Sequence, residues 1–335
     1  MGRLLALLGV ALAIGGPALA AQDGVGNVPS RDPLSLDPAA LDPATPPAVV
    51  QTGVALDERV TIPILIGGKG PWNFIIDTGS QRTVIARDLA QRLALPPRAN
   101  VTIISMTGRA DVGTVALPSL DFGGNRIDDI EAPVLDGDDL GGVGLLGLDS
   151  LHGKRVTLNF RTGRMEITNG GTRRSLSIDP DTIIVEARRR RGQLILLDSD
   201  VNGMRVAVML DTGTNFSIGN LALRDKLVSK RRAPMMTEAT LTSVTGGLLT
   251  GQVGRIRSVR MGRVNLTQVP VLFADASPFA ELGMRDKPAL LLGISALRIF
   301  DRVAIDFGRG RVDFLLPDAS AVEKTRFATN LRSDG

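Results

Sequence analysis

Two copies of an Asp-Thr-Gly motif, 134 residues apart, divide the chain into two similar halves. The copies lie in residues 77–80 (Asp-Thr-Gly-Ser) and 211–214 (Asp-Thr-Gly-Thr), and large apolar residues precede each of them. An apolar segment with a turn signal comes before each copy, and in the second half this signal is the two-residue hairpin turn Asn202-Gly203. A short β-like piece and a helical pattern follow each copy, and we expect the helices at residues 86–93 and 221–228. Such self-similarity indicates that one structural unit occurs twice in the fold.

The correspondence between the halves extends beyond the motifs. Leu-Leu-Gly at 145–147 matches Leu-Leu-Gly at 291–293 with a shift of 146 residues, and 160–167 matches 307–314 with a shift of 147. Both halves therefore share one order of elements: hairpin, Asp-Thr-Gly loop, helix, further strands, Leu-Leu-Gly and a closing hairpin. We predict a mostly β chain that forms two lobes related by a pseudo-two-fold axis.

The composition limits the chemistry that such a chain can perform. It contains no Cys and a single His, His152. Disulfides, thiolate metal sites and a cysteine nucleophile are thereby excluded, and a Ser-His-Asp triad or a two-histidine zinc site is disfavoured. The net charge of only +4 and the 3% of aromatic residues disfavour a nucleic-acid partner. We expect a reaction that uses carboxylates, hydroxyls and backbone groups, with no metal and no cofactor.

The duplicated loops bring two carboxylates together if they face each other across the pseudo-two-fold axis. Asp77 and Asp211 would then lie within a few Å of each other, and two carboxylates at that distance share one proton and titrate as a pair. The ionised member can take a proton from a water molecule, and the protonated member can donate to a carbonyl oxygen. This arrangement hydrolyses an amide without a metal, thiol or histidine.

The residues that follow each aspartate have roles that support such a pair. The glycines allow a sharp turn that brings N–H groups close to the carboxylates. The central threonines can bond across to the opposite loop, and the hydroxyl residues after the glycines can donate to the outer carboxylate oxygens. Local turn-stabilising hydrogen bonds are the alternative for all four hydroxyls. These supporting residues are Thr78, Gly79, Ser80, Thr212, Gly213 and Thr214.

Paired apolar-apolar-Asp-Thr-Gly-Ser/Thr loops, each followed downstream by Leu-Leu-Gly, resemble those of the pepsin/retropepsin aspartic proteases. The resemblance implies a mostly β, bilobal acid protease fold with short helices, over about residues 54–316. It implies that Asp77 and Asp211 are the catalytic pair, and that Gly147 and Gly293 belong to strands that brace the active loops. The short lobes and the simple order of elements look more like a retropepsin unit in tandem. The chain departs from pepsin-like enzymes in having no flap tyrosine and no disulfides.

Two turns match the flaps of this family. Their glycines would supply the mobility that a lid needs, although ordinary β-turns have the same sequence signature. The residues of the two candidate flaps are Met106, Thr107 and Gly108 in the first half and Val244, Thr245 and Gly246 in the second.

The resemblance implies an aspartic endopeptidase. We expect a monomer that binds a protein or peptide substrate extended in the cleft between the lobes, and that acts on exported or membrane-anchored proteins. A catalytically inactive, exported peptide-binding protein of the same fold is the main alternative, but such a protein has no need to retain two buried carboxylates. A carbohydrate hydrolase with two carboxylates would use aromatic platforms, and the chain has one Trp and no Tyr.

The N-terminal segment has the features of an export signal. A positive start, an apolar run at residues 4–14 and the small residues of 18–20 predict cleavage near Ala20 or Ala21, with an uncleaved anchor as the alternative. We therefore expect an exported protein, periplasmic or secreted. The predicted division is a signal peptide at 1–21, a Pro/Asp-rich linker or pro-segment at 22–52, the two protease lobes at 53–180 and 181–316, and a flexible tail at 317–335.

Overall fold

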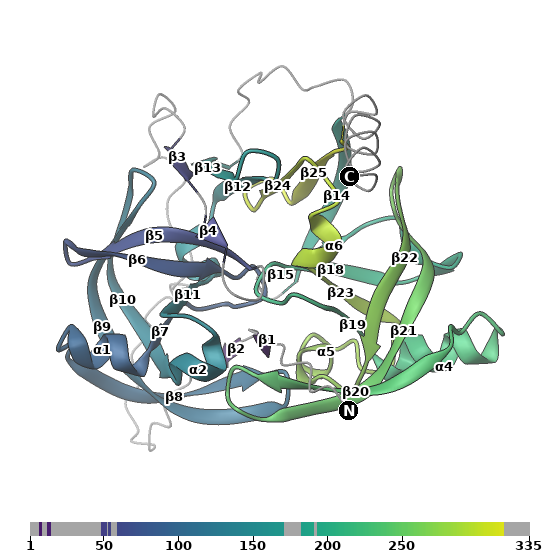
Figure 1. Ribbon diagram of the computed structural model, residues 1–335, viewed down its shortest axis with the longest axis horizontal. Helices are drawn as coiled ribbons and strands as arrows, with labels where there is room; N and C mark the ends of the chain where they lie inside the picture. The colour runs from purple at the N-terminus through teal and green to yellow at the C-terminus, as the bar shows by residue number, and fades with distance from the viewer. Residues whose placement is uncertain are drawn as a thin grey trace, which may run out of the picture.

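The computed structural model describes residues 7–8, 12–14, 48–51, 53–54, 59–170, 182–190 and 193–317. The fold is mostly β and bilobal, as predicted, with one lobe at each side of Figure 1. Most of the predicted signal peptide, linker and tail lies outside the described residues, and so does the predicted lobe boundary at residues 180 and 181. Within the described part of the chain, no helix has the length and apolar character needed to cross a bilayer.

The N-terminal lobe is built on a sheet with the strand order β2-β8-β9-β10-β7-β11-β6-β5-β4. Short helices α1, α2 and α3 connect its strands. The bounds are β2 (Leu12–Ile14), β4 (Gly53–Val54), β5 (Val60–Ile66), β6 (Lys69–Ile76), β7 (Val84–Ala86), α1 (Arg87–Arg92), β8 (Pro97–Ser105), β9 (Gly108–Phe122), β10 (Asn125–Leu135), α2 (Gly137–Leu140), β11 (Gly144–Leu146) and α3 (Leu148–Leu151).

The C-terminal lobe repeats this arrangement, with the strand order β20-β21-β22-β19-β23-β18-β15 and with β1 paired to the outer edge of β20. The bounds are β1 (Leu7–Leu8), β15 (Gln193–Leu196), β16 (Ser199–Val201), β17 (Met204–Arg205), β18 (Ala207–Asp211), β19 (Ser217–Gly219), α4 (Leu221–Ser229), β20 (Met236–Ser243), β21 (Leu248–Met261), β22 (Val264–Phe273), α5 (Ser277–Glu281), β23 (Ala289–Gly293) and α6 (Ile294–Leu297).

A sheet shared by both halves lies at the top of Figure 1 and runs in the order β14-β25-β24-β12-β13-β3. Its bounds are β3 (Ala48–Gln51), β12 (Lys154–Asn159), β13 (Arg164–Asn169), β14 (Thr182–Arg190), β24 (Arg302–Asp306) and β25 (Arg311–Leu315). The halves meet where β12 pairs antiparallel with β24, with Val156 opposite Ile305. The two closing hairpins predicted from the repeat thus join the lobes as one continuous sheet.

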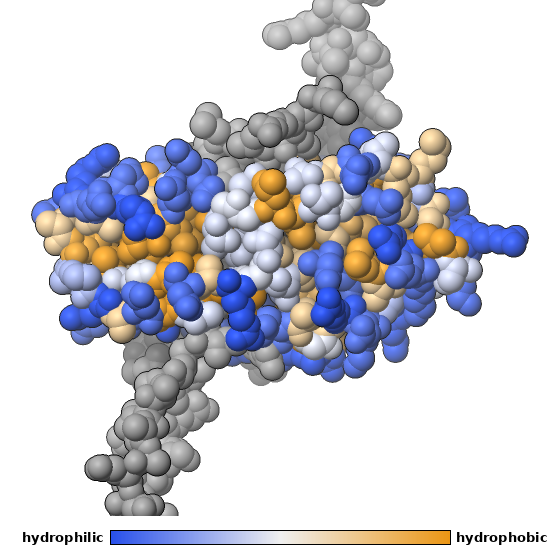
Figure 2. Space-filling model, turned by 90° about the horizontal axis from the view of Figure 1, so that it is seen from below, coloured by the Kyte–Doolittle hydropathy of each residue, from blue (hydrophilic) through white to orange (hydrophobic). Residues whose placement is uncertain are grey.

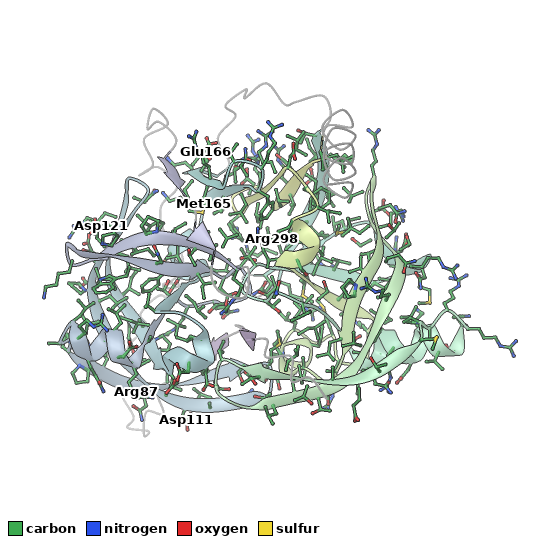
Figure 3. The ribbon with its side chains drawn as sticks, in the orientation of Figure 1. Arg87, Asp111, Asp121, Met165, Glu166 and Arg298 are labelled. Atoms are coloured by element: carbon green, nitrogen blue, oxygen red, sulfur yellow. The ribbon has the colours of Figure 1, made fainter. Side chains whose placement is uncertain are left out.

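Side chains of the shared sheet alternate between the core and the surface, as a strand period of two requires. Met165 on β13 is fully buried, whereas its neighbour Glu166 is partly exposed (Figure 3). A further contact links the halves beside this sheet, because the Arg298 guanidinium lies 5.6 Å from the centre of the Phe160 ring. Such cation–π contacts add about 0.5–1 kcal/mol or more to packing.

The repeat in the sequence corresponds to a repeat in topology. In the first half β11 pairs parallel with β6, and in the second half β23 pairs parallel with β18. The predicted turn at Asn202-Gly203 is a two-residue hairpin turn whose residues have φ angles of 49° and 74°. The helical patterns after the motifs form α1 and α4. The symmetry of the fold therefore places the two Asp-Thr-Gly loops in equivalent positions.

Candidate active site

Each Asp-Thr-Gly loop follows the end of a buried central strand. Asp77 comes directly after β6, and its N–H donates to the carbonyl of Leu146 at 3.0 Å. Asp211 is the last residue of β18 and lies in register with Gly293. Both aspartates are 0% exposed, which is rare for an ionisable side chain. The strands thus deliver two carboxyl groups into the interior between the lobes.

The central threonines of the loops bond across the lobe interface. The Thr78 hydroxyl donates to the carbonyl of Leu210 at 3.1 Å and accepts from the N–H of Thr212 at 3.1 Å. In the reciprocal set, the Thr212 hydroxyl donates to the carbonyl of Ile76 at 2.8 Å and accepts from the N–H of Thr78 at 3.1 Å. All of these groups are buried, so each hydroxyl satisfies two backbone groups that have no water to replace it.

Replacing Thr78 with valine should therefore destabilise the protein by about 2–4 kcal/mol, because valine keeps the shape but leaves a buried N–H and a buried carbonyl unpaired. Thr78→Ser keeps the hydroxyl and should lose only about 1 kcal/mol through its missing methyl group. Urea unfolding followed by circular dichroism measures both values. Equal losses for the two variants would contradict the cross-lobe role of the hydroxyl.

The glycines of the loops bring the two carboxyl groups close together. A Cβ added at Gly79 would lie 2.5 Å from the Asp211 carboxyl, and a Cβ added at Gly213 would lie 2.2 Å from the Asp77 carboxyl. Atoms without a covalent bond do not approach so closely, so any side chain at either position would displace a carboxyl group. Glycine is needed here because each loop is packed against the aspartate of the other.

The two carboxyl groups hold protons more strongly than ordinary aspartates. Burial raises the pKa of Asp77 to about 7, against the lowering effect of the Gly79 and Ser80 N–H groups, which donate to its Oδ1 at 2.8 and 2.9 Å. Burial also raises the pKa of Asp211 well above its ordinary value, and the negative charge of Asp77 raises it further. These raised pKa values disfavour the state in which both carboxyl groups are ionised.

The hydroxyls that follow the glycines bond within their own loops. The Ser80 hydroxyl donates to the carbonyl of Arg82 at 2.7 Å, and the Thr214 hydroxyl donates to the carbonyl of Phe216 at 3.0 Å. Each hydroxyl thus donates its proton to a nearby carbonyl and not to an outer carboxylate oxygen, as the local-turn alternative predicted. A hydroxyl two residues before a free carbonyl satisfies that carbonyl at little entropic cost, which favours the local bond.

The two Leu-Leu-Gly segments lie beside the strands that carry the aspartates. The Gly147 N–H donates to the Thr83 hydroxyl at 3.2 Å, and the Gly293 N–H donates to the Ser217 hydroxyl at 3.2 Å. A Cβ at Gly147 would lie 2.3 Å from the Arg82 carbonyl, and a Cβ at Gly293 would lie 2.5 Å from the Phe216 carbonyl. Because these glycines have no side chain, the Leu-Leu-Gly segments pack directly on the backbone that follows the Asp-Thr-Gly loops, at Arg82 and Phe216.

The two candidate flap turns are hairpin tips that meet each other. Met106 and Thr107 form the tip between β8 and β9, and the Ser105 hydroxyl at its base accepts from Thr245 at 2.9 Å. The tip between β20 and β21 begins at the buried Val244 and continues through Gly246, whose φ is 77°. These hairpins lie at the bottom of Figure 1, and Figure 2 views that side, where a pale band of intermediate hydropathy crosses the middle of the molecule.

The first tip is anchored in the opposite lobe. Met106 is fully buried in an apolar cluster whose other members come from the C-terminal lobe, among them Met209 and Ile218. Its carbonyl accepts from the N–H of Ser277 at 3.0 Å, and the Arg109 guanidinium lies 2.9 Å from the Glu281 carboxylate. The tip of the N-terminal hairpin therefore reaches across to the C-terminal lobe and is held there by contacts with α5.

Two polar side chains beside the loops were missed by the sequence reasoning. Arg59 is 0% exposed, and Gln193 is 4% exposed. Each donates to the glycine carbonyl of the opposite loop, Arg59 to Gly213 at 3.4 Å and Gln193 to Gly79 at 2.7 Å. The repeat contained a signal for them, because both precede their aspartate by 18 residues. Arg59 comes directly before β5, and Gln193 is the first residue of β15.

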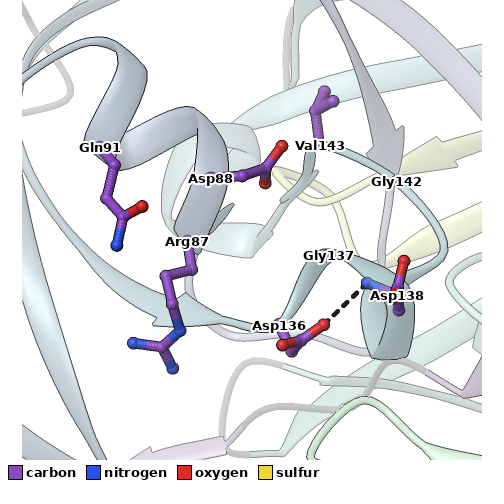
Figure 4. Close-up of a pocket in the computed structure, with 8 residues that line it drawn as sticks. All are labelled: Arg87, Asp88, Gln91, Asp136, Gly137, Asp138, Gly142 and Val143. Atoms are coloured by element: carbon purple, nitrogen blue, oxygen red, sulfur yellow. Dashed lines mark hydrogen bonds between the residues drawn. The ribbon is translucent and has the colours of Figure 1, made fainter.

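A separate polar pocket opens between α1 and α2 (Figure 4). The Asp136 carboxylate accepts from the N–H of Asp138 at 3.0 Å and thereby caps α2. No residue of either Asp-Thr-Gly loop lines this pocket, so it is not the site that the repeat builds. Its lining residues are Arg87, Asp88, Gln91, Asp136, Gly137, Asp138, Gly142 and Val143.

Comparison with known proteins agrees with the geometry of the loops. The family model of aspartyl proteases matches residues 62–150 and 197–296, more than half of the chain, and each matched segment contains one Asp-Thr-Gly loop. A search of curated proteins gave no match. On the strength of the family match and of the paired loops, this chain belongs to the aspartyl protease family.

Proposed function

We propose that the protein is an aspartic endopeptidase that hydrolyses peptide bonds with a water molecule held between Asp77 and Asp211. Membership of the aspartyl protease family supports a protease function in general. The observation that supports the specific mechanism is the pair of fully buried carboxyl groups, each packed under the glycine of the opposite loop and each with a raised pKa. A site that stores one proton between two carboxyls is suited to combined base and acid catalysis.

The proposed reaction proceeds in two proton-transfer steps. The ionised carboxylate takes one proton from water while the water oxygen attacks the carbonyl carbon of the peptide bond, and the protonated carboxyl donates its proton to the carbonyl oxygen. The resulting gem-diol collapses when a proton returns from a hydroxyl to the dyad and the dyad protonates the leaving nitrogen, so that the C–N bond breaks. The Oδ1 atoms bond to the N–H groups of the loops, which fixes the carboxyls and leaves the Oδ2 atoms for these transfers.

An extended peptide is the proposed substrate, and backbone pairing in the molecule supports this class. Strand β2 pairs antiparallel with β8, and β1 pairs parallel with β20. Because β8 and β20 are equivalent strands related by the pseudo-two-fold axis, one peptide that crosses the axis runs antiparallel to one of them and parallel to the other. The N-terminal segment of the chain itself shows these two relationships, so both hairpins can accept an added strand.

Location and assembly belong to the same proposal. The positive, apolar and small-residue regions of residues 1–21 support export, to the periplasm or the medium, and exported or membrane-anchored proteins are then the substrates within reach. Both aspartates lie in one chain, which supports a monomeric enzyme. The reaction needs no cofactor beyond water.

The proposal is tested by incubating the purified chain that begins at Gln22 with a mixed peptide library from about pH 3 to about pH 9, a range that spans the raised pKa of Asp77. Mass spectrometry should detect internal cleavage of extended peptides, and a statine-type mimic of the gem-diol should block it. Peptides that bind but stay intact across the whole range would overturn the proposal and favour an inactive, exported peptide-binding protein.

A further inference from the structure

The donors that reach the two active loops are placed symmetrically but differ in charge. Arg59 precedes β5 and donates to the carbonyl of Gly213, and Gln193 begins β15 and donates to the carbonyl of Gly79. Each thus crosses from its own lobe to the loop of the other. The first donor is a guanidinium, which stays protonated at every pH at which a protein is folded, and the second is a neutral amide.

Of these two donors, the positively charged one lies on the Asp77 side of the pair. Arg59 bonds to Gly213, and Gly213 is the residue whose added Cβ would lie 2.2 Å from the Asp77 carboxyl. Gln193 bonds to Gly79, which packs in the same way against Asp211. The pseudo-two-fold axis therefore relates a cation beside one aspartate to an uncharged group beside the other.

Arg59 is also held in this place by a second bond. Its Nη2 donates to the carbonyl of Leu140, at the end of α2, at 2.6 Å. The side chain is 0% exposed, so its charge acts on its surroundings with little screening by water. A buried guanidinium is costly to retain, and a neutral side chain in the equivalent place makes the same kind of loop contact in the other lobe. A neutral side chain thus suffices for the loop contact in the other lobe, and the arginine adds a positive charge to this contact.

We propose that Arg59 is a positioning residue of the dyad, which makes Asp77 the ionised member and leaves the shared proton on Asp211. Asp77 is then the base that takes the proton of the attacking water, and Asp211 is the acid that donates to the carbonyl oxygen. This inference deepens the proposed function and rests on it for the direction of catalysis. The placement of the charge itself stands on the contacts of Arg59.

The other groups around the pair agree with this assignment. Burial raises the pKa of Asp77, the Gly79 and Ser80 N–H groups lower it, and the charge of Arg59 lowers it as well. For Asp211, burial and the negative charge of Asp77 raise the pKa, and the Gly213 and Thr214 N–H groups lower it, but no arginine is among the main causes of its shift. The nearby elements α2 and α3 contain further carboxyls, but Asp139 on α2 faces Gly246 and Asp149 on α3 accepts from Thr83.

The test varies the number and the side of the charges near the dyad. Arg59→Gln gives the N-terminal lobe the same amide that Gln193 supplies in the C-terminal lobe, and removes the positive charge of Arg59. Arg59→Lys keeps a positive charge and is the matched control. Gln193→Arg gives two cations, and the exchange Arg59→Gln/Gln193→Arg moves the single cation to the other side. The acidic limb of the kcat/KM profile should shift upward by about one pH unit or more in Arg59→Gln. It should stay near that of the parent in Arg59→Lys and in the exchange variant, and move downward in Gln193→Arg.

A readout that needs no turnover keeps this test separate from that of the proposed function. Titration of ¹³C-labelled aspartate carboxyls, assigned with Asp77→Asn and Asp211→Asn proteins, should show Asp77 ionising first in the parent and Asp211 ionising first in the exchange variant. If Gln193→Arg proteins do not fold, Arg59→Gln should still show a higher pKa of Asp77 than Arg59→Lys. An unchanged Asp77 titration in Arg59→Gln, or equal shifts in the glutamine and lysine variants, would overturn the inference. If the titrations are as expected but none of the proteins cleaves a peptide, the proposed endopeptidase function is overturned and the role of Arg59 in the order of ionisation stands.

Discussion

Asp77→Asn and Asp211→Asn proteins should each lose peptide cleavage by at least about 10³-fold in kcat, because each change removes one of the two proton transfers. An asparagine in place of Asp77 cannot take a proton from water, and an asparagine in place of Asp211 cannot donate one to the carbonyl oxygen. Initial rates on a peptide found in the library screen, measured at the pH of highest parent activity, give the size of the loss.

The matched control for these variants is Asp128→Asn, because the Asp128 side chain is 59% exposed and lies on β10. That change should leave kcat within about a factor of two, as expected for a surface position. Cleavage that persists in either dyad variant, with folding verified by circular dichroism, would contradict the shared-dyad mechanism. Loss in the control as well would show that the assay reports folding rather than chemistry.

The stability of the Asp77→Asn protein, relative to the parent, should increase by roughly 4 kcal/mol between pH 4 and pH 8, because burial raises the pKa of Asp77 from 3.8 to about 7. The sign follows from proton binding. Between the unfolded and folded pKa values, the folded parent binds more protons than the unfolded chain, so its stability falls as the pH rises through this window. Asparagine does not titrate and removes this loss.

Urea unfolding of parent and variant at pH 4, 5, 6, 7 and 8 measures the difference, and the Asp128→Asn protein serves again as control because its side chain is exposed. Only the change with pH counts, since asparagine also alters hydrogen bonding at every pH. Parallel stability curves for parent and Asp77→Asn would mean that Asp77 has an ordinary pKa, and would remove the main support for a shared proton.

The repeat was sufficient to predict the class of fold and the position of the loops. The two halves align at their Asp-Thr-Gly motifs, and the motifs lie in equivalent places in the fold. The Asn202-Gly203 pair predicted a two-residue hairpin turn, which the structure contains. Both features can be recognised in one sequence, because a turn depends on neighbouring residues and a repeat can be found by comparing the two halves. The helices after the motifs start and end within a residue of the predicted bounds, since apolar spacing determines them.

Features that depend on contacts between distant residues escaped prediction. Arg59 stands in a charged stretch, where arginines are ordinarily exposed, and only the folded chain shows that it is buried beside the opposite loop. The hydroxyls of Ser80 and Thr214 had two kinds of partner within reach, and local geometry decided in favour of the nearby carbonyls. Composition likewise gave no sign that Met106 would pack with side chains of the other lobe.

The anchoring of Met106 in the opposite lobe determines what it costs to move the first hairpin tip. Lifting this tip takes the thioether out of an apolar cluster of the C-terminal lobe and breaks the hydrogen bond between the Ser277 N–H and the Met106 carbonyl. The two lobes are also joined where β12 pairs with β24, in the shared sheet at the other end of the molecule in Figure 1. If the tip acts as a lid in the proposed enzyme, these contacts give it a defined closed position and add to the barrier for opening.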